Sequence, residues 1–75
     1  MRVLGPDLVS KMTTRQREVL RLLAKGHTMK ETAELLNVKP TTVAFHKYRI
    51  MEKYGLKRNA DLVRLAIREG IISAD

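Results

Sequence analysis

The 75-residue sequence contains no cysteine, no tryptophan and only three other aromatic residues. Without cysteine, the chain can form neither disulfides nor thiolate zinc sites. No apolar run approaches the length needed to cross a bilayer, and the first ten residues lack the apolar core of a signal peptide. These absences lead us to expect a cytoplasmic protein without a membrane partner. Its length suits a single domain with one modest core.

Residues arranged for catalysis are also missing. The acidic residues and the two histidines are scattered, with no paired carboxylates and no glycine-rich phosphate loop. His27 has no second ligand at metal spacing. We therefore expect no enzyme activity, no metal or other cofactor and no small-molecule site.

Positive charge is what the sequence has in excess, and it is concentrated in one segment. Residues 39–58 contain six lysines and arginines and a single anion, Glu52, so this segment carries +5 of the formal charge of +7. A basic block of this kind is typical of a protein with a polyanionic partner. A merely soluble basic surface is the alternative. A membrane-surface helix is disfavoured, because the apolar side chains of this segment are needed for the core.

Helical periodicity predicts an all-α fold. Four helices are expected, at about 14–25, 29–37, 40–54 and 60–69. Thr13 with Gln16, and Thr28 with Glu31, have the spacing of capping boxes, and Asn59 is the expected N-cap of the last helix. We divide the chain into an N-terminal extension or linker at 1–12, with a helical turn at 7–10, and a domain at 13–75. The expected core comprises Val19, Leu20, Leu23, Ala33, Leu36, Val38, Val43, Ile50, Leu62, Val63 and Ala66.

The centre of the chain, residues 28–54, reads as a short helix, a tight turn and a longer basic helix. In the short helix, Leu35 is expected on the apolar side. Asn37 tolerates the left-handed conformation that ends a helix, and Val38 can fill the angle between the two helices. Pro40 suits the first position of the second helix. This pattern is typical of a helix-turn-helix that lays its second helix in the DNA major groove. An ordinary helical hairpin with a solvated basic face is the alternative.

The last helix has more apolar surface than one core requires. Its polar residues Asp61, Arg64 and Arg68 share one narrow arc, and apolar residues occupy most of the remainder. The surplus favours a symmetric homodimer contact through Leu65 and Ile67. A helix sunk deeply between its neighbours would explain the same pattern.

Residues spread across most of the chain match one known sequence pattern, in a single alignment without gaps. It comprises Thr13, Arg15, Glu18-Val19-Leu20, Gly26, Thr28, Lys30-Glu31, Ala33, Leu36, Thr42-Val43, His46, Ile50, Lys53, Gly55, Asp61, Leu62-Val63, Ala66, Gly70 and Ile71. In these positions the sequence resembles the LuxR-type (GerE-type) helix-turn-helix. The resemblance implies a four-helix DNA-binding domain of a bacterial transcription regulator, standing alone or behind a receiver or ligand-sensing domain. It also implies that the second and third helices form the helix-turn-helix and that the fourth often forms the dimer contact.

The sequence departs from the family pattern at four positions. Ala44 stands where a lysine is common, Met29 replaces the usual asparagine, Lys39 the usual Ser or Thr cap, and Asn59 a common arginine. None of these changes breaks the fold pattern. Ala44 and Met29 bear on the target sequence.

The third expected helix presents two sides. Val43, Ile50 and Tyr54 belong to the core side. The opposite side is expected to hold Thr41, Ala44, Phe45, Lys47 and Tyr48. The resemblance implies that four of these, Thr41, Ala44, Phe45 and Tyr48, meet base edges. Phe45 and Ala44 can touch a thymine methyl, and the Tyr48 hydroxyl can hydrogen-bond.

The candidates for phosphate contact lie at the N-terminus of the second expected helix and along the third. They are Thr28, Lys30, Thr42, His46, Lys47 and Arg49. Phe45 can instead be a satellite core contact, and His46 can pack half-buried beside Val43. Lys53, Lys57 and Arg58 can touch the flanking DNA backbone or be merely solvated, and the solvated interpretation is favoured.

Double-stranded DNA is thus the expected partner, with sequence-specific binding and transcription regulation as the function. The competing function is a helical protein-interaction module, similar to a sigma factor, that binds RNA polymerase or a partner regulator. The basic segment at 39–58 favours DNA, whereas the apolar flank of the last helix is what a protein partner would use.

Overall fold

The computed structural model describes residues 12–74. Its regular structure consists of four helices, α2 (Thr14–Ala24), α3 (Met29–Leu36), α4 (Pro40–Tyr54) and α5 (Asn59–Arg68). Within these residues there is no strand, so the all-α prediction is confirmed. Each helix boundary lies within one residue of its expected position. The helical turn expected at 7–10 falls outside the described residues.

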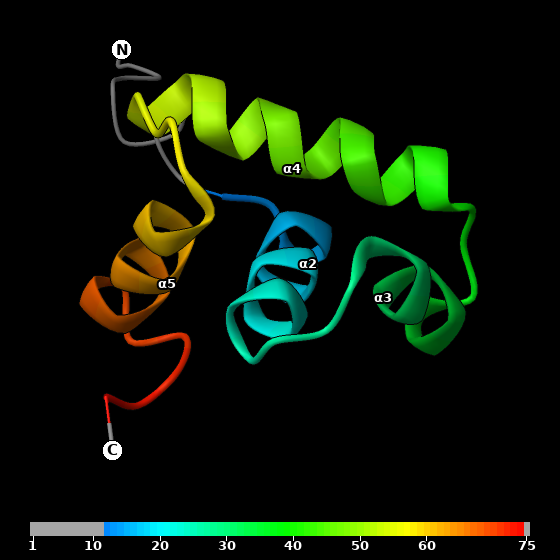
Figure 1. Ribbon diagram of the computed structural model, residues 1–75, viewed down its shortest axis with the longest axis horizontal. Helices are drawn as coiled ribbons and strands as arrows, with labels where there is room; N and C mark the ends of the chain where they lie inside the picture. The colour runs from blue at the N-terminus through cyan, green and yellow to red at the C-terminus, as the bar shows by residue number, and fades with distance from the viewer. Residues whose placement is uncertain (1–11, 75) are drawn as a thin grey trace, which may run out of the picture.

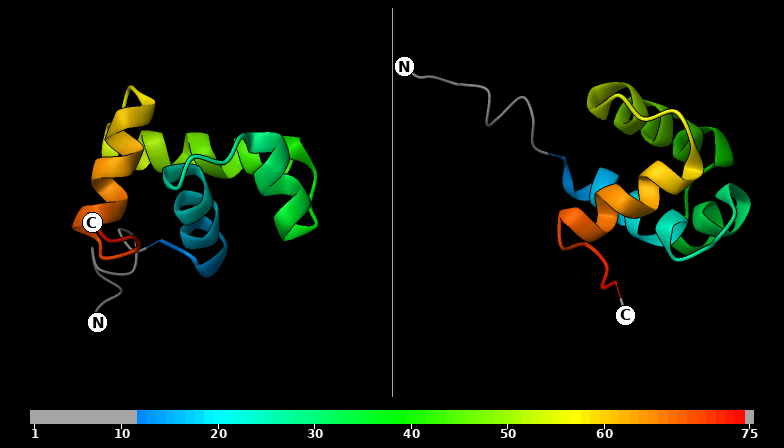
Figure 2. Two further views of the ribbon diagram at one scale, coloured as in Figure 1. Left: turned by 60° about the horizontal axis from the view of Figure 1, so that its bottom comes forward. Right: turned by 60° about the vertical axis from the view of Figure 1, so that its left-hand side comes forward.

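Helix α4 spans the other three helices. In Figure 1, α5, α2 and α3 lie side by side along one side of α4, with α2 in the middle. Helix α2 contacts α3, α4 and α5, and α3 packs against α4. The views of Figure 2 show no other described helix on the far side of α4. One long face of α4 is therefore left open.

Both predicted capping boxes are present. The Thr13 Oγ1 atom accepts from the Gln16 N–H at 3.1 Å, and Thr28 Oγ1 accepts from the Glu31 N–H at 3.0 Å. The Gln16 and Glu31 side chains in turn accept from the N–H groups of Thr13 and Thr28. Glu31 lies 3.7 Å from His27 Nδ1, and its pKa is lowered, first by the Thr28 N–H and then by His27. These bonds fix where α2 and α3 begin.

The turn between α3 and α4 has the predicted conformation. Asn37 is left-handed, with φ 58° and ψ 47°. The Val38 N–H donates a hydrogen bond to the Ala33 carbonyl at 2.9 Å. This is the 6→1 hydrogen bond of a Schellman motif. Lys39 is the N-cap of α4 but makes no side-chain capping bond, and Pro40 occupies the first turn. The turn of the helix-turn-helix therefore has the conformation that its residues predict.

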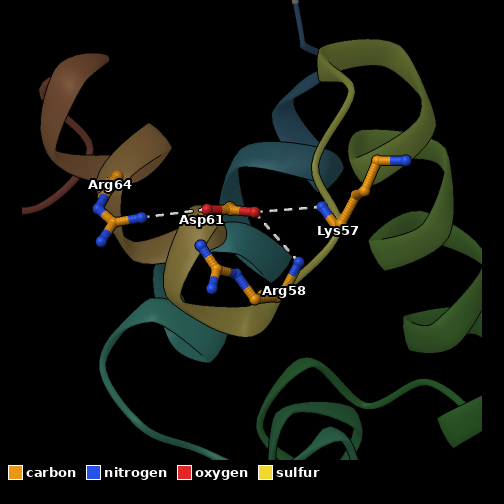
Figure 3. Close-up of polar contacts among 4 residues, drawn as sticks. All are labelled: Lys57, Arg58, Asp61 and Arg64. Atoms are coloured by element: carbon orange, nitrogen blue, oxygen red, sulfur yellow. Dashed lines mark hydrogen bonds and ion pairs between the residues drawn. The ribbon is translucent and has the colours of Figure 1, made fainter.

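The connection from α4 to α5 corrects one prediction. Arg58, and not Asn59, is the N-cap of α5. The Asp61 Oδ2 atom accepts from the N–H groups of Lys57 at 3.2 Å and Arg58 at 3.1 Å, while Oδ1 accepts from Arg64 at 3.2 Å (Figure 3). The Lys57 N–H is the largest cause of the lowered pKa of Asp61. A carboxylate accepts more strongly than a neutral amide, so Asp61 sets the start of the helix one residue early.

The core divides into two clusters that meet along α2. One joins α2 to α5 and the C-terminal half of α4, through Met12, Leu20, Ile50, Leu62, Leu65 and Ala66. The other joins α2 to α3 and the N-terminal half of α4, through Val19, Ala33 and Val43, with Leu23, Leu36 and Val38 packed against it. Ile71 and Ile72 fold back onto the first cluster. Helix α4 is thus held at both ends.

Several expected positions differ from the observed ones. Leu65 is only 1% exposed, so its assignment to an outward dimer contact is wrong. It lies three residues after Leu62 and one before Ala66, on the side of α5 that packs inward. Leu35 was expected on the apolar side of α3, yet it is 60% exposed. Leu23, Leu36, Val38 and Val63 are half-buried, whereas Met12, Leu22 and Thr32 are buried beyond expectation.

The hydroxyl of Thr32 is a buried polar group whose removal should stabilise the fold. Thr32 is fully buried, and its Oγ1 atom has no hydrogen-bond partner in the structure. Because Thr32→Val keeps the shape and removes the hydroxyl, we expect the free energy of unfolding to rise by about 1–2 kcal/mol. Urea denaturation followed by circular dichroism measures the change. The exposed Thr14→Val is the matched control and should change little. A loss of stability in Thr32→Val would mean that the hydroxyl has a partner after all.

Candidate nucleic-acid interface

The open face of α4 carries the four residues expected to read bases. Thr41, Phe45 and Tyr48 are exposed and Ala44 is half-buried. They lie three or four residues apart and therefore share one side of the helix. Val43 and Ile50, on the other side, are fully buried. Phe45 is 58% exposed and Tyr48 is 57% exposed, so Phe45 is not the satellite core contact that was its alternative. We refer to Thr41, Ala44, Phe45 and Tyr48 as the reading face.

Each aromatic ring of the reading face has a cation beside it. The guanidinium carbon of Arg49 is 5.7 Å from the centroid of the Phe45 ring. The Lys47 Nζ atom is 5.5 Å from the centroid of the Tyr48 ring. The ring of Phe45 also meets the ring of His46 edge-on, at 5.6 Å between centroids. Both distances to cations are within the range of cation–π attraction, so each cation can favour the observed orientation of its ring.

The phosphate candidates are spread over two helices. Thr28, Lys30 and Arg49 are exposed, while Thr42 and Lys47 are half-buried. The capping box uses the N–H groups of Thr28 and Glu31, which leaves those of Met29 and Lys30 as the open donors of the first turn. Lys30 can thus add its charge to a helix N-terminus that already favours an anion.

His46 is half-buried, as its alternative interpretation held. Its Nδ1 atom is enclosed and has no hydrogen-bond partner in the structure. Any contact of His46 with phosphate would therefore use Nε2, the other ring nitrogen.

A groove of about 490 Å³ brings together two phosphate candidates from different helices. Thr28, at the start of α3, and Lys47, in the middle of α4, both line it, together with His27, Asn59 and an apolar floor that includes Leu62. The structure thus places Lys47 toward α3 and α5, whereas Phe45 and Tyr48 face away from the core.

Two charged residues in or next to α4, Lys39 and Glu52, were not among the candidate site residues. Lys39 is an exposed cation directly before α4. Glu52 is exposed and lies four residues after Tyr48, which puts an anion on the same side of α4 one turn beyond the reading face. Helical spacing from Tyr48 is the signal that finds Glu52 in the sequence. A carboxylate there opposes phosphate, so the face suited to DNA ends near Arg49.

Other kinds of site find no support among residues 12–74. No group of three or more His, Asp or Glu side chains in that range could hold a metal ion. None of the helices described is both long and apolar enough to cross a membrane.

The outer side of α5 offers a smaller apolar surface than expected. With Leu65 in the core, Ile67 at 38% exposure is the exposed large hydrophobic residue of this helix. The ion pair between Arg64 and Asp61, at 3.2 Å, lies on the polar side of the same helix.

Comparisons with a family model and with curated proteins point to the same family. Residues 10–66 match the model described as bacterial regulatory proteins, luxR family. The oxygen regulatory protein NreC of Staphylococcus aureus strains JH9, JH1 and USA300 is 43% identical over 61 residues, which cover 81% of this chain. The chain spans only 28% of the length of these curated relatives. No solved structure matches it significantly. A helix-turn-helix in the predicted register and a family match over most of its length show that the chain belongs to the luxR family of bacterial regulatory proteins.

Proposed function

We propose that this DNA-binding domain inserts α4 into the major groove of duplex DNA and regulates transcription from the site that it selects. One observation carries the proposal. The side of α4 turned away from the core presents two exposed aromatic rings, each beside a cation. Exposed aromatic residues are unusual on a surface that only meets water, and a helix face of this kind fits the major groove.

Contacts to phosphate would position the domain, and contacts to bases would select the sequence. In this proposal Lys30 and Lys47 approach the DNA backbone from α3 and α4. Thr28, Thr42, His46 and Arg49 are the other phosphate candidates. Thr41, Ala44, Phe45 and Tyr48 then meet base edges. The regulatory names of the relatives support transcription regulation as the role of a longer protein that carries such a domain.

The phosphate contacts can be tested by salt dependence. Lys30→Ala and Lys47→Ala each remove a candidate phosphate-contacting cation, one from α3 and one from α4, and we expect them to weaken binding about equally on all duplex sequences. A variant that neutralises one phosphate fewer releases fewer counterions when it binds. The steepness of log affinity against log salt should therefore fall by about one unit per variant. Gel shifts or fluorescence anisotropy over a range of salt concentrations measure the slope.

Lys25→Ala is the matched control, since this exposed lysine lies at the C-terminal end of α2. It should leave the salt slope nearly unchanged. If the parent chain shows no salt-dependent binding to any duplex, the DNA proposal fails and the protein-interaction module takes its place.

We further propose that two copies pair through α5 on DNA. Ile67 is the outward apolar residue that supports this contact. Ile67→Asp places a charge in it and should lower the copies bound per operator from two to one, while the isolated domain keeps its fold. Sedimentation of both proteins, free and with an operator fragment, measures the stoichiometry. Equal stoichiometry and affinity for the two proteins would place the dimer contact elsewhere or exclude it.

A further inference from the structure

The reading face lacks the side chains that distinguish bases by paired hydrogen bonds. Guanine is usually read by arginine or lysine, and adenine by asparagine or glutamine. The reading face holds instead a threonine, an alanine, a phenylalanine and a tyrosine. The nearby cations Arg49 and Lys47 lie beside the two aromatic rings. Specificity must therefore come mainly from a feature of the major groove other than a bidentate hydrogen bond.

One feature of the groove matches this surface. The C5 methyl of thymine is the apolar group that base pairs present there. Phe45 and Ala44 are neighbours on α4, and the Phe45 ring is more than half exposed, at 58%. An exposed ring beside a small side chain leaves space for a methyl group to pack against it. The Tyr48 hydroxyl lies one turn further and can reach a neighbouring polar edge.

Two neighbouring side chains favour one orientation of the Phe45 ring before any ligand arrives. Arg49 lies over it at 5.7 Å from one turn along α4, and the edge-on contact with His46 restrains it further. A ring fixed in this way loses less side-chain entropy on binding than a free one. Arg49 is also exposed and can face the DNA backbone while it stays near the ring. Its position therefore links the orientation of Phe45 to the approach of phosphate.

We propose that the chain selects its DNA site mainly by the 5-methyl groups of pyrimidines in the major groove, with Phe45 as the methyl-contacting residue and Arg49 as its positioning residue. This inference rests on the proposed function and specifies what the reading face recognises.

The test replaces thymine by deoxyuridine, which keeps every hydrogen-bonding atom and removes only the methyl. The preferred duplex is first selected from a random library with the 75-residue chain. Each thymine of that site is then replaced singly by deoxyuridine. At the contacted positions we expect binding to weaken about fourfold per methyl, as for the loss of one buried methyl group. Replacing such a thymine by 5-methylcytosine, opposite guanine, should cost less than replacing it by cytosine.

Protein variants separate the two assigned roles. Phe45→Ala should bring the ratio of thymine to uracil affinity close to one. Arg49→Gln should lower this ratio, whereas Arg49→Lys keeps a cation near the ring and should keep more of it. Lys30→Ala is the control, because it should weaken binding to both duplexes equally and leave the ratio unchanged. Circular dichroism confirms that each variant is helical.

Two results would overturn the proposal. If the chain binds its selected site in a salt-dependent manner but every uracil duplex binds as tightly as its thymine parent, methyl recognition is wrong and the proposed function stands. Selection of a site that has no thymine at the base pairs contacted by Phe45 would also refute methyl recognition and leave the proposed function standing. Absence of salt-dependent binding to any duplex would refute the proposed function, and this inference with it.

Discussion

Replacing Phe45 by alanine is expected to remove most of the sequence preference of the domain. The ring is 58% exposed and contributes no buried surface to either core cluster, so the fold should persist. Loss of its contact with base edges should cost on the order of 1–3 kcal/mol on the preferred site and little on random DNA. Tyr48→Ala should behave in the same way. Titration of each variant with the selected duplex and with a scrambled duplex, at one salt concentration, measures the effect.

Leu35→Ala is the matched control for this experiment. Leu35 is as exposed as Phe45, at 60%, but it lies on α3. Its replacement should change neither preference nor affinity by more than about 0.5 kcal/mol. A Phe45→Ala protein that keeps both its helicity and its full site preference would show that the reading face has been assigned wrongly. DNA binding itself would be untouched by that result.

Ile50→Ala should have the largest effect on stability. Ile50 is fully buried where α4 meets the cluster formed with α2 and α5. Truncating a buried isoleucine costs about 2–5 kcal/mol, whereas a domain of this length has only about 4–11 kcal/mol in total. The thermal midpoint should therefore fall by roughly 10 °C or more. Urea denaturation monitored by circular dichroism gives the free energy of unfolding directly.

Ile67→Ala is the control for Ile50→Ala, because it removes the same atoms from a residue that is 38% exposed. It should cost clearly less, about 1 kcal/mol or under. Similar losses in the two variants would contradict the division of α5 and α4 into inner and outer faces. DNA binding by Ile50→Ala should decline only with the folded fraction, since this side chain does not reach the open face of α4.

The helices and the turn were predictable because their signals are local. A capping box needs only two residues three apart, and both boxes at Thr13 and Thr28 are present. A left-handed Asn37 and a first-turn Pro40 likewise depend on single residues. The starting point of α5 was not predictable in the same way. Asp61 reaches the N–H groups of two earlier residues, so the cap depends on how the connection from α4 is folded.

The inner and outer positions of apolar residues were harder to predict. Leu65 and Ile67 have similar side chains, and only the packing of α5 against α2 shows that Leu65 is inside. Leu35 and Leu36 are adjacent, yet one is exposed and the other half-buried. The exposure of Thr41, Phe45 and Tyr48 followed from helical spacing, whereas Lys47, expected on the same side, is half-buried and lines the groove beside α3 and α5. The cations beside Phe45 and Tyr48 did not follow from this spacing, because several rotamers of a long side chain are open at the same backbone position.

The separation of the two sides of α4 has a consequence for how such a regulator can evolve. Val43 and Ile50 anchor the helix on one side, while Thr41, Phe45 and Tyr48 project from the other and support no packing in either core cluster. Substitutions at these three exposed positions should change the free energy of unfolding little. On the proposed function, a gene that encodes this domain can therefore acquire a new operator after duplication through a few changes on one helix face. Intermediate variants along that path should remain folded, so selection can act on the target site alone.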